Sequence, residues 1–251
     1  MKKIKFGKLT LTLDQEENQY SVTSCEQDVT EIEIPARVEG IAVTSVGESA
    51  FENCKLLTGV TFPPVDGDAW INGEEFKEIG EHAFSGCSSL SRIVIPESVC
   101  IIGYGAFSNC TSLVSATLPD CCIGIYAFSH CTSLTEISAL SYINEGQFSH
   151  CRSLTALPLK ADATEISEDA FEHCDSLADI TIPRSVKTVG ALAFRGCKEL
   201  KRVTFEEPNG WYDKNVYRIK SYELDLSDPE KNAKMLSGMD FDDGCDGWFR
   251  K

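Results

Sequence analysis

The sequence has few basic residues and no long apolar run. It contains 23 Lys and Arg against 39 Asp and Glu, which gives a formal net charge of −16. A groove that binds nucleic acid needs clustered Lys and Arg, so the composition argues against nucleic acid as a partner. No apolar stretch approaches the roughly 18–20 residues that cross a bilayer, so we expect no membrane insertion.

Patterns typical of catalytic and cofactor sites are also missing. We find no P-loop, no G-x-S-x-G elbow, no H-E-x-x-H motif and no Rossmann glycine set. None of the twelve cysteines forms a C-x-x-C pair, which argues against zinc ribbons and thioredoxin-type redox sites. The sequence therefore predicts a protein that is not an enzyme and uses no cofactor.

The N-terminus lacks the apolar segment of a signal peptide. Its basic start is followed by Leu9, Leu11 and Leu13 in alternation with threonines, which is a strand pattern. On this basis we expect a cytoplasmic protein. Secretion or display at the cell surface is the alternative, if a signal has been removed.

What the sequence does contain is a repeat. Each anchoring Phe is followed by Cys three residues later and Leu six residues later, and is preceded by Val or Ile five residues earlier. The anchors are Phe51, Phe84, Phe107, Phe128, Phe148, Phe171 and Phe194. The unit reads approximately V-x-x-I-G-x-x-A-F-x-x-C-x-S-L-x-x-I-x-I-P, and this regularity predicts a repeat architecture.

The repeat has a physical interpretation. Its L-x-x-I-x-I-P segment alternates apolar and polar residues and predicts a short strand, whereas A-F-x-x-C predicts a tight turn. One unit cannot bury its own apolar side, but stacked units can. We therefore expect a β-rich α/β solenoid, a leucine-rich-repeat stack of about seven to eight units of 20–23 residues with terminal caps.

The units resemble the BspA-like leucine-rich repeats of bacteria. The resemblance rests on "IPESVCIIGYGAFSNCTSLVSATLP" at 95–119 and on the entry stretch at 20–54, and it covers about residues 20–205. The chain departs from the family pattern at Asn144, Gln147 and Ser167. The resemblance implies a non-enzymatic solenoid for protein recognition, with bacterial surface adhesion or host interaction as its setting. An intracellular scaffold or a small-molecule-binding protein is the alternative.

Three regions are expected along the chain. Residues 1–35 form an N-terminal β cap with a first partial repeat, with strands at 4–13 and 19–24. Residues 36–205 hold the repeats, with an insertion at about 64–75. Residues 206–251 form a C-terminal cap with a short helix, for which Ser227 and Glu230 suggest a capping box around Pro229. The residues expected to cover the last repeat are Trp211, Met235, Leu236, Trp248 and Phe249.

The predicted strands also define a candidate binding face. The residue between the two paired apolar positions points outward and is mostly short and hydroxylic. The row consists of Glu33, Thr61, Val94, Thr117, Ser138, Pro158, Thr181 and Thr204. We take Thr61, Val94, Thr117, Ser138, Thr181 and Thr204 as candidate binding residues for an unidentified protein partner, together with Trp70 in the insertion. Ordinary β-propensity on an exposed sheet is the alternative explanation.

The residues before the repeat cysteines invite a metal hypothesis. They are Asn53, Gly86, Asn109, His130, His150, His173 and Gly196. Asn, Gly and His tolerate positive φ better than most residues, which predicts a left-handed turn position. The alternatives are a metal site at His130, His150 and His173, or a pH-sensitive face. The cysteines themselves are expected to be buried, reduced core residues.

Overall fold

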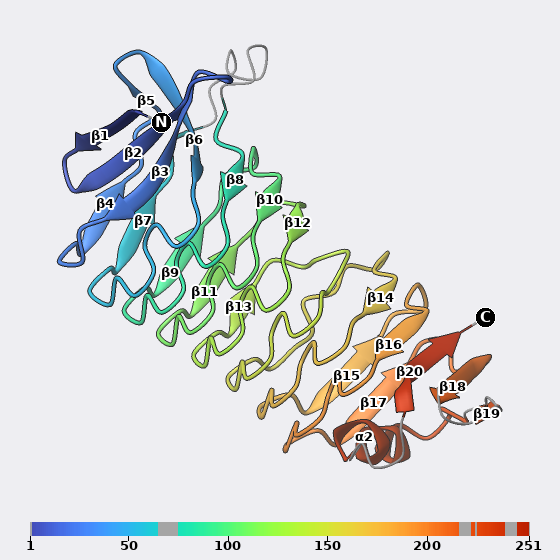
Figure 1. The fold of residues 1–251 in the computed structure, drawn as a ribbon. Coiled ribbons are helices and arrows are strands. Elements are labelled where there is room, and N and C mark those ends of the chain that lie inside the picture. The colour runs from blue at the N-terminus through green and yellow to red at the C-terminus, as the bar shows by residue number, and fades with distance from the viewer. Residues whose placement is uncertain (1, 65–74, 216–221, 224, 239–244, 251) are drawn as a thin grey trace. The chain divides into compact units, whose positions relative to one another are not determined.

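Stacked solenoid coils of short β-strands build both units of the chain, residues 1–138 and residues 139–251 (Figure 1). The structure is a computed structural model, which describes residues 2–64, 75–215, 222–223, 225–238 and 245–250. The expected β-rich solenoid is confirmed, although helix contributes little to it. None of the described helices is long and apolar enough to cross a membrane.

In the first unit, the strands that follow each repeat leucine run parallel along one side, and we call them the front strands. Strand β4 (Glu31–Glu33) pairs with β7 (Gly59–Thr61). Strand β11 (Ser115–Thr117) lies between β9 (Arg92–Val94) and β13 (Glu136–Ile137). Their alternation follows the predicted pattern, because Ile93 and Ala116 are buried whereas Val94 and Thr117 are exposed.

A second row of strands, which we call the rear strands, was not predicted from the sequence. The order along this sheet is β6 (Ile41–Val46), β8 (Glu78–Ile79), β10 (Ile101–Ile102) and β12 (Cys122–Ile123), all parallel. The sequence indicated their buried Val or Ile as core positions only. Two-residue strands leave too little alternation to be recognised.

The N-terminal cap extends the rear sheet. Strands β1 (Lys2–Phe6), β2 (Leu9–Asp14) and β3 (Gln19–Cys25) form an antiparallel meander, and β3 pairs in parallel with β6. The single strand expected at 4–13 is therefore wrong, because the chain turns at Gly7, whose φ is +57°. Strand β5 (Arg37–Val38) pairs antiparallel with the first residues of β6.

The repeat phenylalanines and cysteines form the core between front and rear strands. In the first unit the rings of Phe51, Phe84, Phe107 and Phe128 stack with centroids 4.8–5.3 Å apart. Three of its cysteine thiols donate to the carbonyl of the Phe one repeat earlier, and Cys87 does so to Phe51 at 3.1 Å. The same bond joins Cys110 to Phe84 and Cys131 to Phe107. Cysteine suits the column because it is small, apolar and still able to donate.

The second unit repeats this core and then closes it. The ring of Phe171 stacks between those of Phe148 and Phe194, at 5.6 and 5.5 Å. Strand β15 (Asp179–Ile182) pairs with β17 (Arg202–Phe205). Strand β14 (Glu165–Ile166) pairs with β16 (Thr188–Gly190), and β20 (Cys245–Arg250) then adds antiparallel to β16. Strands β18 (Trp211–Asn215) and β19 (Tyr222–Glu223) complete that sheet.

The C-terminal helix α2 (Pro229–Ser237) packs against β17. Its N-cap is Asp228, whose Oδ1 accepts from the backbone amides of Glu230 and Lys231, so the capping box expected at Ser227 is wrong. Asp at this position caps as well as Ser does. Trp211 is buried with its ring 5.0 Å from Phe205, and Leu236 is buried as well. The expected roles of the Trp248 and Phe249 side chains lie outside what the structure describes.

The repeats at the start of the second unit are irregular. Pro158, expected to point outward, is buried, and Leu159 joins Leu140 through an isolated bridge. Gln147 replaces the usual Ala and is fully buried, where its Oε1 accepts from the amide of Asn144 at 2.8 Å. The polar side chain is thus used to satisfy a turn amide.

Candidate functional site

The predicted binding residues are divided between the two units, and each unit is described by itself. In the first unit, Thr61, Val94 and Thr117 are exposed on β7, β9 and β11, whereas Ser138 is half-buried. The Oγ of Ser138 accepts from the amide of Leu118 at 2.9 Å and so supports the backbone. In the second unit, Thr181 and Thr204 are exposed register partners on β15 and β17. Trp70 lies outside the described residues.

A second outward row lies beside the predicted one in the first unit. It contains the residue two positions earlier in each front strand: Glu31, Gly59, Arg92, Ser115 and Glu136. This row was not predicted from the sequence, although the same alternation that placed Thr61 outward also places Gly59 outward. Both rows together form the face on which the charges lie.

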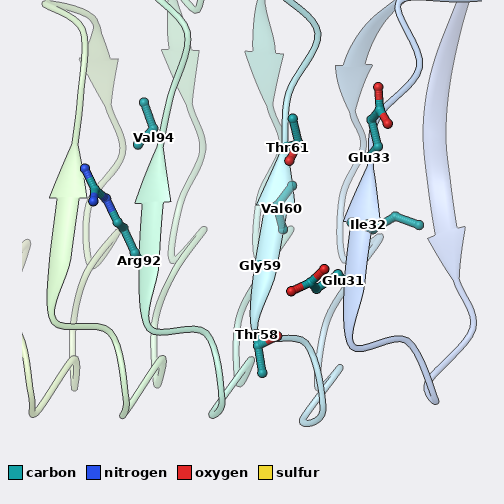
Figure 2. A pocket seen from close by; sticks show the side chains of 9 residues that line it. All are labelled: Glu31, Ile32, Glu33, Thr58, Gly59, Val60, Thr61, Arg92 and Val94. Carbon is teal, nitrogen blue, oxygen red and sulfur yellow. The ribbon is translucent and has the colours of Figure 1, made fainter.

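The two rows enclose a shallow groove of about 490 Å³ across β4, β7 and β9 (Figure 2). Its lining residues are Glu31, Ile32, Glu33, Thr58, Gly59, Val60, Thr61, Arg92 and Val94. We call it the front groove. It joins two of the predicted residues, Thr61 and Val94, to charged residues that the sequence analysis did not single out.

Gly59 lies on β7, in the middle of the front groove, and has no side chain to fill it. It is the register partner of Glu31 on β4, and an ideal Cβ on Gly59 would meet only the Cγ of Glu31, at 3.9 Å. Figure 2 shows Glu31 pointing from β4 toward β7, and Arg92 pointing from β9 away from β7. The absence of a side chain therefore keeps the middle strand accessible to a ligand.

The charges of the front groove are unneutralised by the described residues. Glu31 and Glu33 lie on β4, and neither forms an ion pair or side-chain hydrogen bond with the described part of the chain. Arg92, on β9, likewise has no ion-pair partner among the residues described. Thr58 is engaged, since its Oγ1 donates to the carbonyl of Thr30 at 2.8 Å. The groove can thus accept a cationic group at β4 and a carboxylate or carbonyl at β9.

A second hollow, of about 500 Å³, lies in the second unit between β15, β17 and α2. It is lined by Asp179, Leu200, Lys201, Arg202, Glu230 and Lys234. Its charges are mixed, and Lys201 pairs with Glu199 at 3.5 Å. Neither hollow contains the nucleophile–base pair of a hydrolytic site.

The histidines take the expected backbone conformation. His130, His150 and His173 have φ of +61°, +61° and +55°, beside Asn53 at +58° and Asn109 at +60°. The predicted left-handed turn position is therefore confirmed. Within the second unit the rings of His150 and His173 stack at 4.7 Å. No group of three or more His, Cys, Asp or Glu side chains suited to a metal ion occurs among the described residues.

The sequence matches the family described as BspA type leucine-rich repeat region. Six copies match, over residues 16–66, 70–161 and 138–225. The matches include the front groove and nearly all of the described repeats. No curated protein matches the sequence.

Solved bacterial structures share the fold. A leucine-rich repeat protein of T. pallidum is similar with a TM-score of 0.61 and 24% identity, over 79% of this chain and 91% of that one. A leucine-rich repeat protein of Bacteroides ovatus ATCC 8483 is similar with a TM-score of 0.56 and 26% identity, over 77% of this chain. The matched part spans 56% of the Bacteroides ovatus chain.

Proposed function

Because the chain belongs to the BspA-type leucine-rich repeat family, we propose that it is a non-enzymatic recognition protein whose front groove binds a protein partner. Repeat solenoids of this kind present extended faces for binding, and the leucine-rich repeat families are generally without catalytic activity. The observation that carries the proposal is the open, charged groove across β4, β7 and β9, with Gly59 at its centre.

The groove suits an extended segment of a partner better than a small molecule. It is shallow and open along the strands, whereas small-molecule sites enclose most of their ligand. Its acidic wall at Glu31 and Glu33 favours a Lys or Arg side chain, and Arg92 favours a carboxylate or a backbone carbonyl. Thr61 and Val94 supply a hydroxyl and an apolar contact between them.

The biological setting proposed is adhesion to a surface or to a host protein, with an intracellular scaffold as the second candidate. Adhesion follows from the family resemblance, whereas the scaffold follows from the cytoplasmic location expected from the sequence. Fractionation of the native cells separates them. A chain confined to the cytosol contradicts adhesion.

The binding proposal is tested by filling the groove. Proteins that co-purify with the chain from native cells are identified, and the purified partner is titrated calorimetrically against wild type and Gly59→Arg. Gly59 has no positive φ and room for a side chain, so the fold should tolerate the substitution. We expect at least about a ten-fold loss of affinity, the scale of one blocked contact of about 1.4 kcal/mol.

The matched control is Ser112→Arg, which adds the same charge at an exposed turn of the same unit outside the groove. It should bind as wild type does. A partner that binds all three proteins equally uses another surface, and the front groove is then not the recognition site.

A further inference from the structure

A row of aromatic and apolar side chains is exposed on the opposite edge of the first unit, beside the rear strands. The residues that follow the repeat glycines stack rung upon rung in the order Glu48, Glu81, Tyr104 and Ile125. Their backbones are in close contact, since an ideal Cβ on Gly103 would lie 2.6 Å from the amide of Glu81. This row begins acidic and ends apolar.

Neighbouring rows extend the apolar part. Ile101, on β10, stands between Glu78 and Cys122 in the register of the rear strands. The ring of His82 meets Tyr104 edge-on at 5.0 Å, and Tyr104 meets Tyr126 at 6.0 Å. We call this group the tyrosine edge: His82, Ile101, Tyr104, Ile125 and Tyr126.

The tyrosine edge is accessible. Ile101 is 47% exposed, Tyr104 39% and Ile125 37%. Clustered exposed aromatic and apolar side chains are costly in water and are enriched where proteins bind. Single exposed apolar residues need no such explanation, but Ile101, Tyr104 and Ile125 lie on adjacent rungs, beside the half-buried His82 and Tyr126.

The carboxylates beside the tyrosine edge have no ion-pair partner among the described residues. Glu48, Glu78 and Glu81 are exposed, and none forms an ion pair with the described residues. The nearby cation Lys77 already lies 3.9 Å from Glu75. The faces of the tyrosine rings add negative potential to that of the carboxylates.

From these observations we propose that the tyrosine edge is a second docking surface, for a partner-protein segment that carries Arg or Lys beside apolar side chains. The apolar side chains pack on Ile101 and Ile125, while a guanidinium or ammonium group lies over Tyr104 and pairs with Glu81. A second copy of this chain fits poorly, because its net charge of −16 adds repulsion. The surface is independent of the front groove.

The test uses the full chain and a fluorescein-labelled peptide of alternating Leu and Arg. Two companion peptides replace every Arg by citrulline or by Glu. Fluorescence anisotropy is measured for wild type, Tyr104→Ser, Ile125→Ser, Glu81→Gln and the control Tyr142→Ser. Tyr142 is 49% exposed and lies in the other unit. It is therefore an exposed tyrosine, like Tyr104, that is not part of the tyrosine edge. Thermal unfolding verifies that each variant is folded.

We expect the Arg peptide to bind wild type in a salt-dependent manner and the citrulline and Glu peptides to bind more weakly. Tyr104→Ser should lose about two- to five-fold in affinity, the range for an exposed cation–π contact. Glu81→Gln should lose up to about five-fold, the range for an exposed ion pair. Ile125→Ser should also weaken binding, and Tyr142→Ser should not.

Three results overturn the proposal. Equal binding of the Arg and citrulline peptides removes the charge requirement. If Glu81→Gln lowers the affinity for the Arg peptide but Tyr104→Ser and Ile125→Ser do not, only the negative charge attracts the peptide and the aromatic and apolar side chains take no part. Self-association in sedimentation that Tyr104→Ser abolishes shows that a second copy of the chain occupies the edge.

Discussion

At the scale of single residues, backbone conformation explains residue types that could be mistaken for metal ligands. The His-Cys pairs suggest metal ligation, yet each His occupies the left-handed position that Asn and Gly fill in other repeats. A second left-handed position precedes each repeat Phe by two residues and holds such different residues as Ser49, His82 and Leu192. The repeat therefore constrains φ more tightly than side-chain type at these turns.

The histidine position gives the first prediction. Replacing His130, His150 and His173 together by Asn should leave the thermal unfolding temperature close to that of wild type. Replacing them by Ala should cost about 1 kcal/mol each, because Ala pays more for a positive φ. If the histidines instead bind zinc, zinc should raise the unfolding temperature of wild type by the linkage effect and fail to do so in the Asn variant. That result contradicts a purely conformational role.

Gly105 gives a second prediction, in which strain and crowding can be separated. Its φ is +55°, and an ideal Cβ would lie 2.8 Å from the ring of His82. Gly7 has a similar φ of +57° with nothing within 4 Å of that Cβ. Chemical denaturation should show Gly105→Ala to be more destabilising than Gly7→Ala, which reports strain of about 1 kcal/mol alone. Equal losses would show that the His82 ring moves aside freely.

Asp169 gives a third prediction, on pH. Burial, followed by the nearby carboxylates of Glu172, Glu168 and Glu145, raises the pKa of Asp169 from 3.8 to about 6, against the opposing effect of Arg195. An acid with a raised pKa in the folded state favours folding below its unfolded pKa, and that contribution is lost as the pH rises towards 6.

Asp169→Asn should therefore raise the unfolding temperature at pH 7 and have little effect at pH 4. Asn also tolerates the φ of +53° found there. The exposed Asp179→Asn serves as the control. A gain in Asp169→Asn that is equally large at both pH values contradicts the assignment.

At the scale of elements, each turn of the solenoid depends on its neighbours. The strands have two to four residues in most repeats, too few to be stable alone, and they persist because the leucine, phenylalanine and cysteine columns are buried beside them. The thiol-to-carbonyl bonds then link successive turns through the core.

The leucine column gives the fourth prediction. Leu134 and Leu177 are fully buried, one in each unit, so Leu134→Ala and Leu177→Ala should each cost about 2–5 kcal/mol through lost burial and a cavity. Leu56→Ala, at a residue 54% exposed, should cost well under 1 kcal/mol. Urea unfolding measures all three. An unchanged midpoint for Leu134→Ala or Leu177→Ala would mean that the column residue is not packed as described.

At the scale of the whole molecule, the acidic charge and the thiols are the dominant features. The net charge of −16 favours cationic partners at both proposed surfaces. All repeat cysteines are buried as free thiols, and burial raises the pKa of Cys110 and Cys174 well above the usual value. Such thiols are poorly reactive at neutral pH.

The thiols give the fifth prediction. Titration of the unfolded protein without reductant should find close to twelve free thiols, the full count of the sequence. The parallel cysteines of the column oppose disulfide geometry. A count near ten would contradict the prediction. It would point first to Cys25 and Cys54, because a hydrogen bond between these two thiols raises the pKa of Cys25.

The sequence by itself determined the repeat, the core columns, the left-handed histidine position and the front strands, because each repeats at a fixed spacing along the chain. Features that occur only once were predicted less well. The helix N-cap is Asp228, whereas Ser227 was predicted, and Pro158 is buried, whereas an outward position was predicted. Only the tertiary structure decided the rear sheet, the hollow at Gly59 and the tyrosine edge. Each of these arises from residues about one repeat apart that meet through stacking, and neighbouring residues in the sequence carry no sign of that contact.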